Sequence, residues 1–196
     1  MRKIFNYDAL DQSKIVKKLS DPNQTYPNTI SSGGCLFYKK TQSKLEGHDM
    51  LSVLLISYSD PHWNRLDDFG GQVDPSDQSI YQTIIRETRE ESNGLIKLEE
   101  KTLTSARTFY NKSTKYYSVV IPVDPDFYPE TKVFGEHETT DQIRRQIQWY
   151  PYQEVIEKLS MRLVSNKALL DFLTSEAGMQ KESRPTTTKK SLPLML

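Results

Sequence analysis

The sequence predicts an α/β fold, because segments with the composition of strands and segments with the periodicity of helices follow one another along the chain. Residues 51–58 form an apolar run rich in Val, Leu and Ile, which is typical of a buried strand. Farther along, apolar residues at helical spacing form a stripe suited to packing against a sheet: Ile80, Tyr81, Ile84 and Ile85. The length of 196 residues suggests one domain.

The two ends of the chain are expected to lie outside this domain. Residues 8–19 predict a short helix that packs on the domain or on a second subunit, and the proline-containing residues 21–28 predict a connector. The end of the chain is rich in Lys, Ser, Thr and Pro and cannot bury enough apolar surface to fold. The sequence therefore predicts three parts: an N-terminal helix and connector at 1–28, a folded domain at 29–177 and a disordered tail at 178–196.

Strands are expected on both sides of the apolar stripe. Strand character begins near Thr29, a polar loop is expected at 41–49, and the run at 51–58 gives the next strand. Residues 102–110 and 116–123 predict a hairpin with a polar turn. The remaining expected elements are a strand over 143–149 and helices over 153–159 and 168–173.

Three carboxylates share one side of the central helix. Glu87, Glu90 and Glu91 are spaced i, i+3 and i+4, and a helical wheel places Glu87 and Glu91 at the border of the apolar stripe and Glu90 farther toward water. Like charges at i,i+4 cost roughly 0.2–0.5 kcal/mol per pair. A solvated acidic face is the commoner explanation of such a pattern, whereas a hard divalent cation such as Mg²⁺ would turn the repulsion into binding.

Turn residues precede and follow this helix. Gly70 and Gly71 allow a tight turn and a close approach of the backbone to a ligand. Residues 74–77 have the composition of a turn that leads into a helix, and Asn93 with Gly94 suits a helix end in the left-handed conformation.

Residues 71–94 resemble the Nudix box, whose pattern is G-x5-E-x7-R-E-U-x-E-E-x-G-U with U a bulky apolar residue. Gly71 matches the first glycine, and the catalytic core of the pattern falls on Arg86, Glu87, Glu90 and Glu91. The chain departs from the pattern in four places: Asp77 stands where a glutamate is usual, eight residues instead of seven separate it from Arg86, Thr88 replaces an apolar residue, and Asn93 delays Gly94 by one place.

The resemblance implies a Nudix fold, a mixed β-sheet sandwiched between helices, and an enzyme that acts on phosphorus-containing anhydrides. It implies a Mg²⁺-dependent pyrophosphohydrolase, with Mn²⁺ as a possible substitute, that cleaves a nucleoside diphosphate linked to another moiety by attack of water at phosphorus. Glu87, Glu90 and Glu91 would hold the metal together with the backbone near Gly71, and Arg86 would orient one of these carboxylates.

Other site residues are expected outside the box. The resemblance implies that the general base is a box glutamate or one from a later loop, where Glu136 and Glu138 are the candidates. Arg65 and Arg107 are candidates for contact with a distal phosphate of the substrate. We interpret Arg144 and Arg145 as strand-edge residues, because no third basic residue lies close by in the sequence.

Two other functions remain open. A Nudix mRNA-decapping hydrolase would act on RNA 5′ ends, but 26 basic and 26 acidic residues give no global field for RNA, although an extra N-terminal helix and a basic tail favour this function. A nucleotide-binding module without catalysis would not need three metal-binding carboxylates.

Composition also bounds the compartment and the partners. The single cysteine, Cys35, excludes a disulfide framework and favours a reducing cytoplasm. There is no signal-peptide pattern and no apolar run long enough to span a bilayer, so we expect a soluble protein without a membrane partner. The three histidines show no metal-ligand spacing. A monomer and a homodimer are both compatible with the sequence.

Overall fold

The computed structural model describes Leu19 and residues 30–42, 49–59, 65–125, 131–138 and 144–178. Leu19 forms an isolated antiparallel bridge with Ile30. The helix and connector expected over residues 8–28, apart from Leu19, and the tail after Gly178 lie outside these residues.

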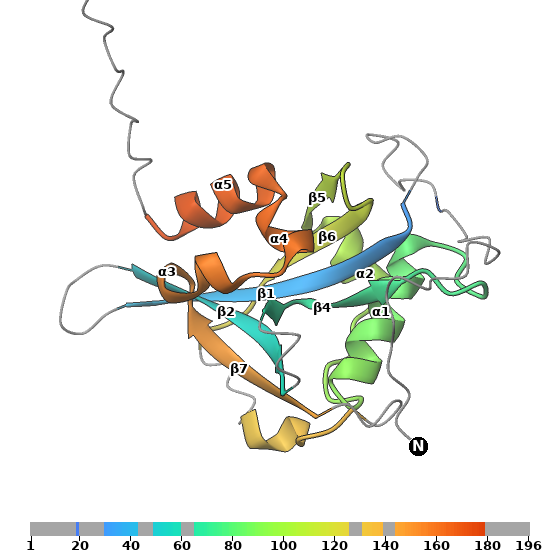
Figure 1. Ribbon diagram of the computed structural model, residues 1–196, viewed down its shortest axis with the longest axis horizontal. Coiled ribbons are helices and arrows are strands. Elements are labelled where there is room, and N and C mark those ends of the chain that lie inside the picture. The colour runs from blue at the N-terminus through green and yellow to red at the C-terminus, as the bar shows by residue number, and fades with distance from the viewer. Residues whose placement is uncertain are drawn as a thin grey trace, which may run out of the picture.

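The centre of the fold is a mixed sheet with the path β3-β2-β1-β6-β5, in which β4 also pairs with β1 and β7 with β2 (Figure 1). The β1–β6 pair is parallel and the other pairs are antiparallel. The strands are β1 (Ser32–Gln42), β2 (Asp49–Tyr58), β3 (Leu66–Asp67), β4 (Phe69–Gln72), β5 (Arg107–Asn111), β6 (Tyr116–Pro122) and β7 (Arg145–Pro151).

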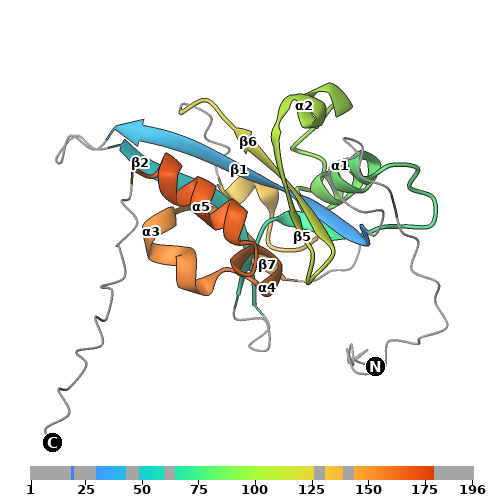
Figure 2. The same cartoon turned by 90° about the horizontal axis from the view of Figure 1, so that it is seen from above.

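Helices cover both faces of the sheet (Figures 1 and 2). On one face, α1 (Ile80–Glu91) and α2 (Glu100–Ser105) pack into a core that contains Ile84 and Leu103. On the other face, a second core contains residues of the last elements, α3 (Tyr152–Val155), α4 (Met161–Val164) and α5 (Lys167–Glu176). The short 3₁₀ helices are η3 (Thr131–Phe134) and η4 (Ile156–Lys158). The predicted α/β fold with a mixed sheet between helices is therefore confirmed.

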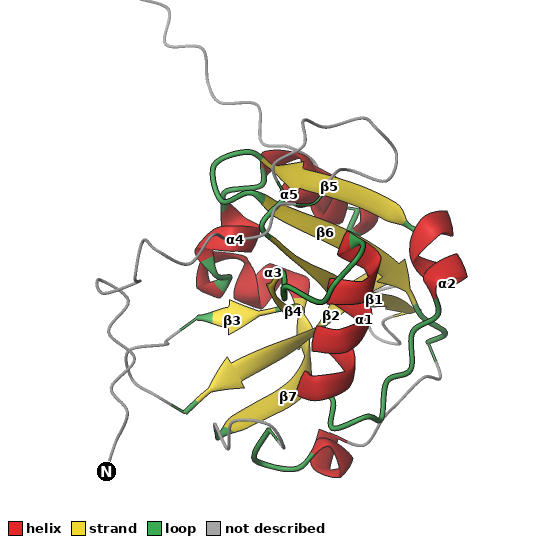
Figure 3. Ribbon diagram, turned by 90° about the vertical axis from the view of Figure 1, so that its right-hand side faces the viewer, coloured by secondary structure: helices red, strands yellow, loops and turns green. Residues whose placement is uncertain are grey.

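Helix α1 begins and ends where its local sequence indicates. The Ser79 hydroxyl accepts a hydrogen bond from the Gln82 backbone N–H at 3.2 Å, which caps the first turn. After the last turn, Asn93 and Gly94 have φ of 52° and 76°, so the chain leaves the helix through the left-handed region. The apolar stripe faces the sheet, and α1 lies beside β4 and β1 in Figure 3.

The strand expected over residues 102–110 is wrong in its first half. Residues 100–105 form α2, and only Arg107–Asn111 is a strand. Leu103 is fully buried while Lys101 and Thr104 are exposed, and a single helical turn is enough to place one apolar side chain in the core. The hairpin itself is confirmed, because β5 pairs with β6 and the Asn111 carboxamide oxygen accepts from the backbone of Ser113 at 3.1 Å.

Several element boundaries also differ from the predictions. The loop expected over residues 41–49 is shorter in the structure, because the pairing of β1 with β2 continues through Thr41 with Met50 to Gln42 with Asp49. The helix expected over 153–159 is divided into α3 and η4, and α4 was not predicted. Among the described helices, none is long and apolar enough to cross a bilayer.

Candidate active site

Gly70 and Gly71 lie within strand β4, so the tight turn expected there is wrong, but their backbone does lie close against neighbouring groups. Gly70 and Gly71 lie opposite Gly34 and Gly33 in the antiparallel pair of β4 with β1. A Cβ atom at Gly71 would overlap the carboxylate of Glu87. Residue 71 therefore has to be glycine for this carboxylate to reach the strand.

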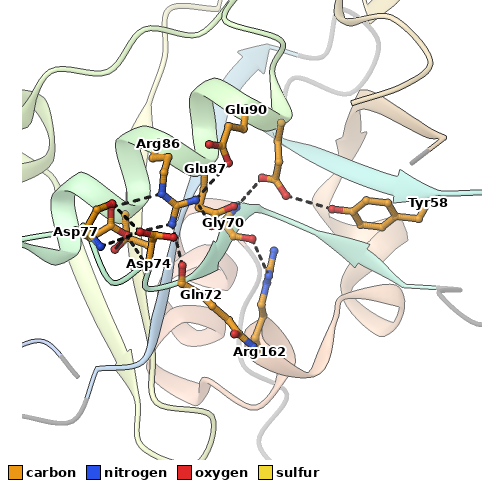
Figure 4. Close-up of polar contacts among 12 residues, drawn as sticks. Tyr58, Gly70, Gln72, Asp74, Asp77, Arg86, Glu87, Glu90 and Arg162 are labelled. Atoms are coloured by element: carbon orange, nitrogen blue, oxygen red, sulfur yellow. Dashed lines mark hydrogen bonds and ion pairs between the residues drawn. The ribbon is translucent and has the colours of Figure 1, made fainter. Parts of the chain in front are cut away.

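Glu91 is held by two donors. It is 5 % exposed, and its Oε2 accepts the backbone N–H of Gly70 at 2.7 Å while its Oε1 accepts the hydroxyl of Tyr58 at 3.2 Å (Figure 4). These two hydrogen bonds fix the orientation of the Glu91 carboxylate. Sequence reasoning did not identify Tyr58, which lies in a strand 33 positions away and carries no local signal.

Arg86 joins the acidic groups of α1 to the preceding turn. Its Nη1 donates to Glu87 Oε1 at 2.7 Å and to Glu90 Oε2 at 3.2 Å. Its Nη2 donates to Asp77 Oδ2 at 3.1 Å and to the Gln72 carbonyl at 2.9 Å. One planar guanidinium therefore holds two carboxylates of α1 and both sides of the turn before it, as Figure 4 shows.

The charge of Arg86 also affects Asp77. Burial raises the pKa of the Asp77 carboxyl, but hydrogen bonds from Arg86, the Asp74 backbone and Thr83 leave this pKa below its ordinary value. Asp77 stands at the position where the family pattern has a glutamate, and it reaches Arg86 in spite of the extra residue between them.

Negative charge is crowded around Glu91. Burial is the main reason why the pKa of the Glu91 carboxyl is raised, and the positive charge of Arg162 opposes this shift. The charges of Glu87, Glu138 and Asp68 raise the pKa further. Burial likewise raises the pKa of Glu87, although Arg86 opposes it. A cation bound here would relieve this repulsion.

A second arginine reaches the backbone of β4 from the opposite layer. Arg162 in α4 donates from Nη1 to the Gly70 carbonyl at 3.0 Å and from Nη2 to the Asp68 carbonyl at 2.8 Å. Its Nε pairs with Asp67 at 2.7 Å and with Asp68 at 2.9 Å, and the guanidinium lies 4.9 Å from the Tyr116 ring centroid. Gly70 is therefore bound to Arg162 through its carbonyl and to Glu91 through its N–H.

The two candidate bases from the later loop have different environments. Glu138 is 8 % exposed and lies within electrostatic range of Glu91. The Glu136 side chain is 71 % exposed and pairs with Arg144 at 3.3 Å. Of the two, only Glu138 is close to the carboxylates of α1.

The interpretation of Arg145 as a strand-edge residue is wrong. Arg145 is 2 % exposed, and its Nη2 donates to the backbone carbonyl of Glu91. Side chains alternate along a strand, so Arg145 points to the same face as the buried Ile147. Its positive charge lies at the C-terminal end of α1, where the helix dipole favours a cation. Arg144 is exposed, as expected.

The structure does not bring the other two candidate arginines to the carboxylates. Arg65 is exposed and donates from Nη1 to the Glu157 carbonyl at 2.7 Å. Arg107 lies 4.8 Å from the ring centroid of Phe172 in α5, on the layer opposite α1. Within the described residues, no group of three His, Cys, Asp or Glu side chains is gathered closely enough to hold a metal, and Arg86 forms ion pairs with both Glu87 and Glu90.

Comparison with known proteins gives one family match. The family model described as NUDIX domain matches residues 41–172, a range that includes β4 with its two glycines, α1 and Glu138. No curated protein matches the chain.

Solved structures with a similar fold share little sequence with the chain. An Ap4A hydrolase of C. elegans in a binary complex is 22 % identical, covers 77 % of this chain and 100 % of its own, and has a TM-score of 0.43. The M. smegmatis Nudix hydrolase RenU is 14 % identical, covers 83 % of this chain and 98 % of its own, and has a TM-score of 0.46. The NUDIX domain of Shewanella oneidensis NrtR, in complex with ADP ribose, is 16 % identical, covers 80 % of this chain and 92 % of its own, and has a TM-score of 0.45.

Proposed function

Because this chain belongs to the Nudix family, we propose that it hydrolyses a diphosphate bond in a nucleoside diphosphate linked to another moiety, with Mg²⁺ as cofactor. Its general class is that of a Nudix pyrophosphohydrolase, an enzyme acting on phosphorus-containing anhydrides. The observation that carries the proposal is the placement of Glu87, Glu90 and Glu91 on one side of α1, beside the glycines of β4.

The residues present suit a magnesium ion by their chemistry. All side-chain donors are carboxylate oxygens, which Mg²⁺ prefers. Within the described residues, Glu87 Oε2 and Glu90 Oε1 accept no hydrogen bond and remain available as ligands, and Gly71 leaves room for the Glu87 carboxylate. Glu87, Glu90 and Glu91 would hold the ion together with the backbone at Gly71. Mn²⁺ has similar ligand preferences and is expected to substitute.

The chain's own groups orient the reaction. Bound Mg²⁺ supplies neutralisation of the phosphoryl oxygens and a lower pKa of a coordinated water. Arg86 restricts the rotamers of Glu87 and Glu90, and Tyr58 with the Gly70 N–H directs both oxygens of Glu91. Glu138, which is largely withdrawn from solvent, is our candidate for the group that accepts the proton of the attacking water.

A substrate screen with two carboxylate variants tests this proposal. ADP-ribose, dinucleoside polyphosphates, nucleoside triphosphates and capped RNA would be incubated with Mg²⁺, Mn²⁺ or a chelator, and the products would show which bond is cut. Glu90→Gln and Glu91→Gln should each lower kcat by more than about 100-fold, beyond the 10–100-fold typical of residues behind the metal ligands. Glu99→Gln, an exposed carboxylate outside the site, is the control.

Each outcome of the screen has a defined meaning. Unchanged turnover in folded Glu91→Gln would remove the metal assignment. Preferential cleavage of capped RNA would support the decapping function, and nucleotide binding without any cleavage would support the binding module. A cytoplasmic location, suggested by the lone and buried Cys35, and the choice between monomer and homodimer remain predictions.

A further inference from the structure

The C-terminal end of α1 contains a residue with an unusual combination of contacts. Asn93 has a φ of 52°, and its backbone N–H donates to the Glu90 carbonyl at 3.0 Å. The next N–H, that of Gly94, donates to the Arg89 carbonyl at 2.7 Å. Asparagine is one of the few residues other than glycine that tolerates this left-handed region, so the backbone alone would accept either residue here.

The Asn93 side chain connects α1 to a distant segment. Its Nδ2 donates to the Phe134 carbonyl at 2.7 Å and to the His137 carbonyl at 3.0 Å. A carboxamide nitrogen carries two hydrogens, so both are used on backbone oxygens of residues 131–138. A glycine at this position would offer no donor, and an aspartate would place an oxygen against two carbonyl oxygens.

Several contacts hold residues 131–138, and Glu138 lies at the end of this segment. Phe134 is fully buried in the core beneath α1. The Glu136 carbonyl accepts the backbone N–H of Arg145 at 2.8 Å, which joins the segment to the start of β7. The carboxamide of Asn93 attaches the segment to the helix that carries Glu90 and Glu91.

We propose that Asn93 is a positioning residue that holds Glu138 close to Glu91. The inference rests on the proposed function, because the location of Glu138 matters for turnover only if Glu138 serves the hydrolysis. Asn93 is also the residue by which the chain departs from the family pattern at the end of the box. The extra residue therefore supplies a bond between the carboxylate helix and the segment of the candidate base.

Two substitutions in the full chain distinguish the effect of the Asn93 carboxamide from the effect of the backbone conformation and from that of an added charge. Asn93→Gly keeps the left-handed conformation and removes both donors, and Asn93→Asp keeps the shape but adds a negative charge. Both should lower kcat by about 10–100-fold, with the KM and the Mg²⁺ concentration for half-activation changed by less than about twofold. If Asn93→Gly keeps the wild-type kcat, the inference is overturned, and a loss confined to Asn93→Asp would then reflect only its charge.

A double-mutant cycle with Glu138→Gln shows whether the effect passes through Glu138. We expect Asn93→Gly to lower kcat in the wild type and to change it by less than about twofold in the Glu138→Gln background. Effects that multiply would mean that Asn93 acts independently of Glu138, and the inference would be abandoned. Wild-type turnover of Glu138→Gln would likewise overturn it. Glu99→Gln serves as the matched Glu-to-Gln control.

Hydrogen exchange gives a readout that does not depend on activity. In Asn93→Gly, amides of residues 131–138 should exchange at least about tenfold faster, while amides of residues 80–88 should keep the wild-type rate. If the protein hydrolyses no substrate but this exchange pattern is found, the proposed function is wrong, while the attachment of residues 131–138 to α1 by Asn93 is supported. An unchanged exchange rate in residues 131–138 would contradict the attachment of this segment by Asn93.

Discussion

At the scale of single residues, Arg86 makes a set of contacts that a lysine at the same position could not make. It binds two carboxylates of α1, the carboxylate of Asp77 and the carbonyl of Gln72 with one planar group. A lysine ammonium carries the same charge but is a compact donor without this fork. The orientation of Glu87 and Glu90 therefore depends on the guanidinium and not only on its charge.

The substitution Arg86→Lys tests this dependence. We expect kcat to fall by about 10–100-fold, because the two carboxylates are no longer held in one geometry. The control is Arg89→Lys, an exposed arginine one turn along the same helix. Steady-state kinetics of both variants at saturating Mg²⁺ would decide, and equal turnover in the two variants would show that charge alone is sufficient.

Asp68 gives a prediction for the pH dependence of stability. Asp68 is fully buried, and burial, opposed by Arg162, raises the pKa of its carboxyl to about 6 from an ordinary value of 3.8. Between these values the folded state binds more protons than the unfolded state. The contribution of Asp68 to stability is therefore fully present below the lower value and is lost as the pH rises through about 6.

Urea unfolding at pH 7 and pH 5 measures this contribution. On lowering the pH, the wild type should gain about 1 kcal/mol in the free energy of unfolding relative to Asp68→Asn, which has no group to titrate. Titrating groups that do not interact with Asp68 cancel in the difference between the two proteins. A difference that stays constant or changes in the opposite direction would show that the pKa of Asp68 is not raised in the folded state.

At the scale of elements, the site depends on the close approach of α1 to β4. The apolar stripe of α1 faces the sheet, while Glu87 and Glu91 lie at its border and meet the strand at its two glycines. The elements must approach closely enough that any side chain at Gly71 would occupy the space of the Glu87 carboxylate.

Gly71→Ala is expected to strain this contact. The variant should lose about 1 kcal/mol of stability, because the Glu87 carboxylate is the far end of a flexible side chain and can turn away at the cost of its ion pair with Arg86. Because the clash is with the Glu87 carboxylate, Gly71→Ala should cost less stability in the Glu87→Ala background than in the wild type. Chemical denaturation of the two single variants and the double variant completes the cycle, and purely additive losses would place the strain elsewhere.

At the scale of the whole molecule, the site is assembled from both layers of the fold. Tyr58 comes from β2, Arg145 from β7 and Arg162 from α4, and each contacts Glu91 or the backbone to which Glu91 is bound. Arg162 belongs to the layer opposite α1, so its contact with the Gly70 carbonyl connects that layer to β4. The carboxylate helix is thus fixed by residues that are distant from it in sequence.

The sequence alone predicted those features that depend on neighbours along the chain. The face shared by Glu87, Glu90 and Glu91, the left-handed end at Asn93 and the strand at 51–58 follow from helical periodicity, turn chemistry and apolar composition. Where one buried side chain decided the structure, as Leu103 does in α2, composition predicted a strand and the prediction was wrong.

Only the tertiary structure decided which distant groups meet the carboxylates. The position of Arg145 against Glu91 and that of Arg107 over Phe172 depend on the pairing of strands and on which face of the sheet each side chain takes. A local pattern carries no information on such pairings, because they are set by the packing of the whole chain. The sequence by itself therefore determined the family and the row of carboxylates, and the fold determined the partners that orient them.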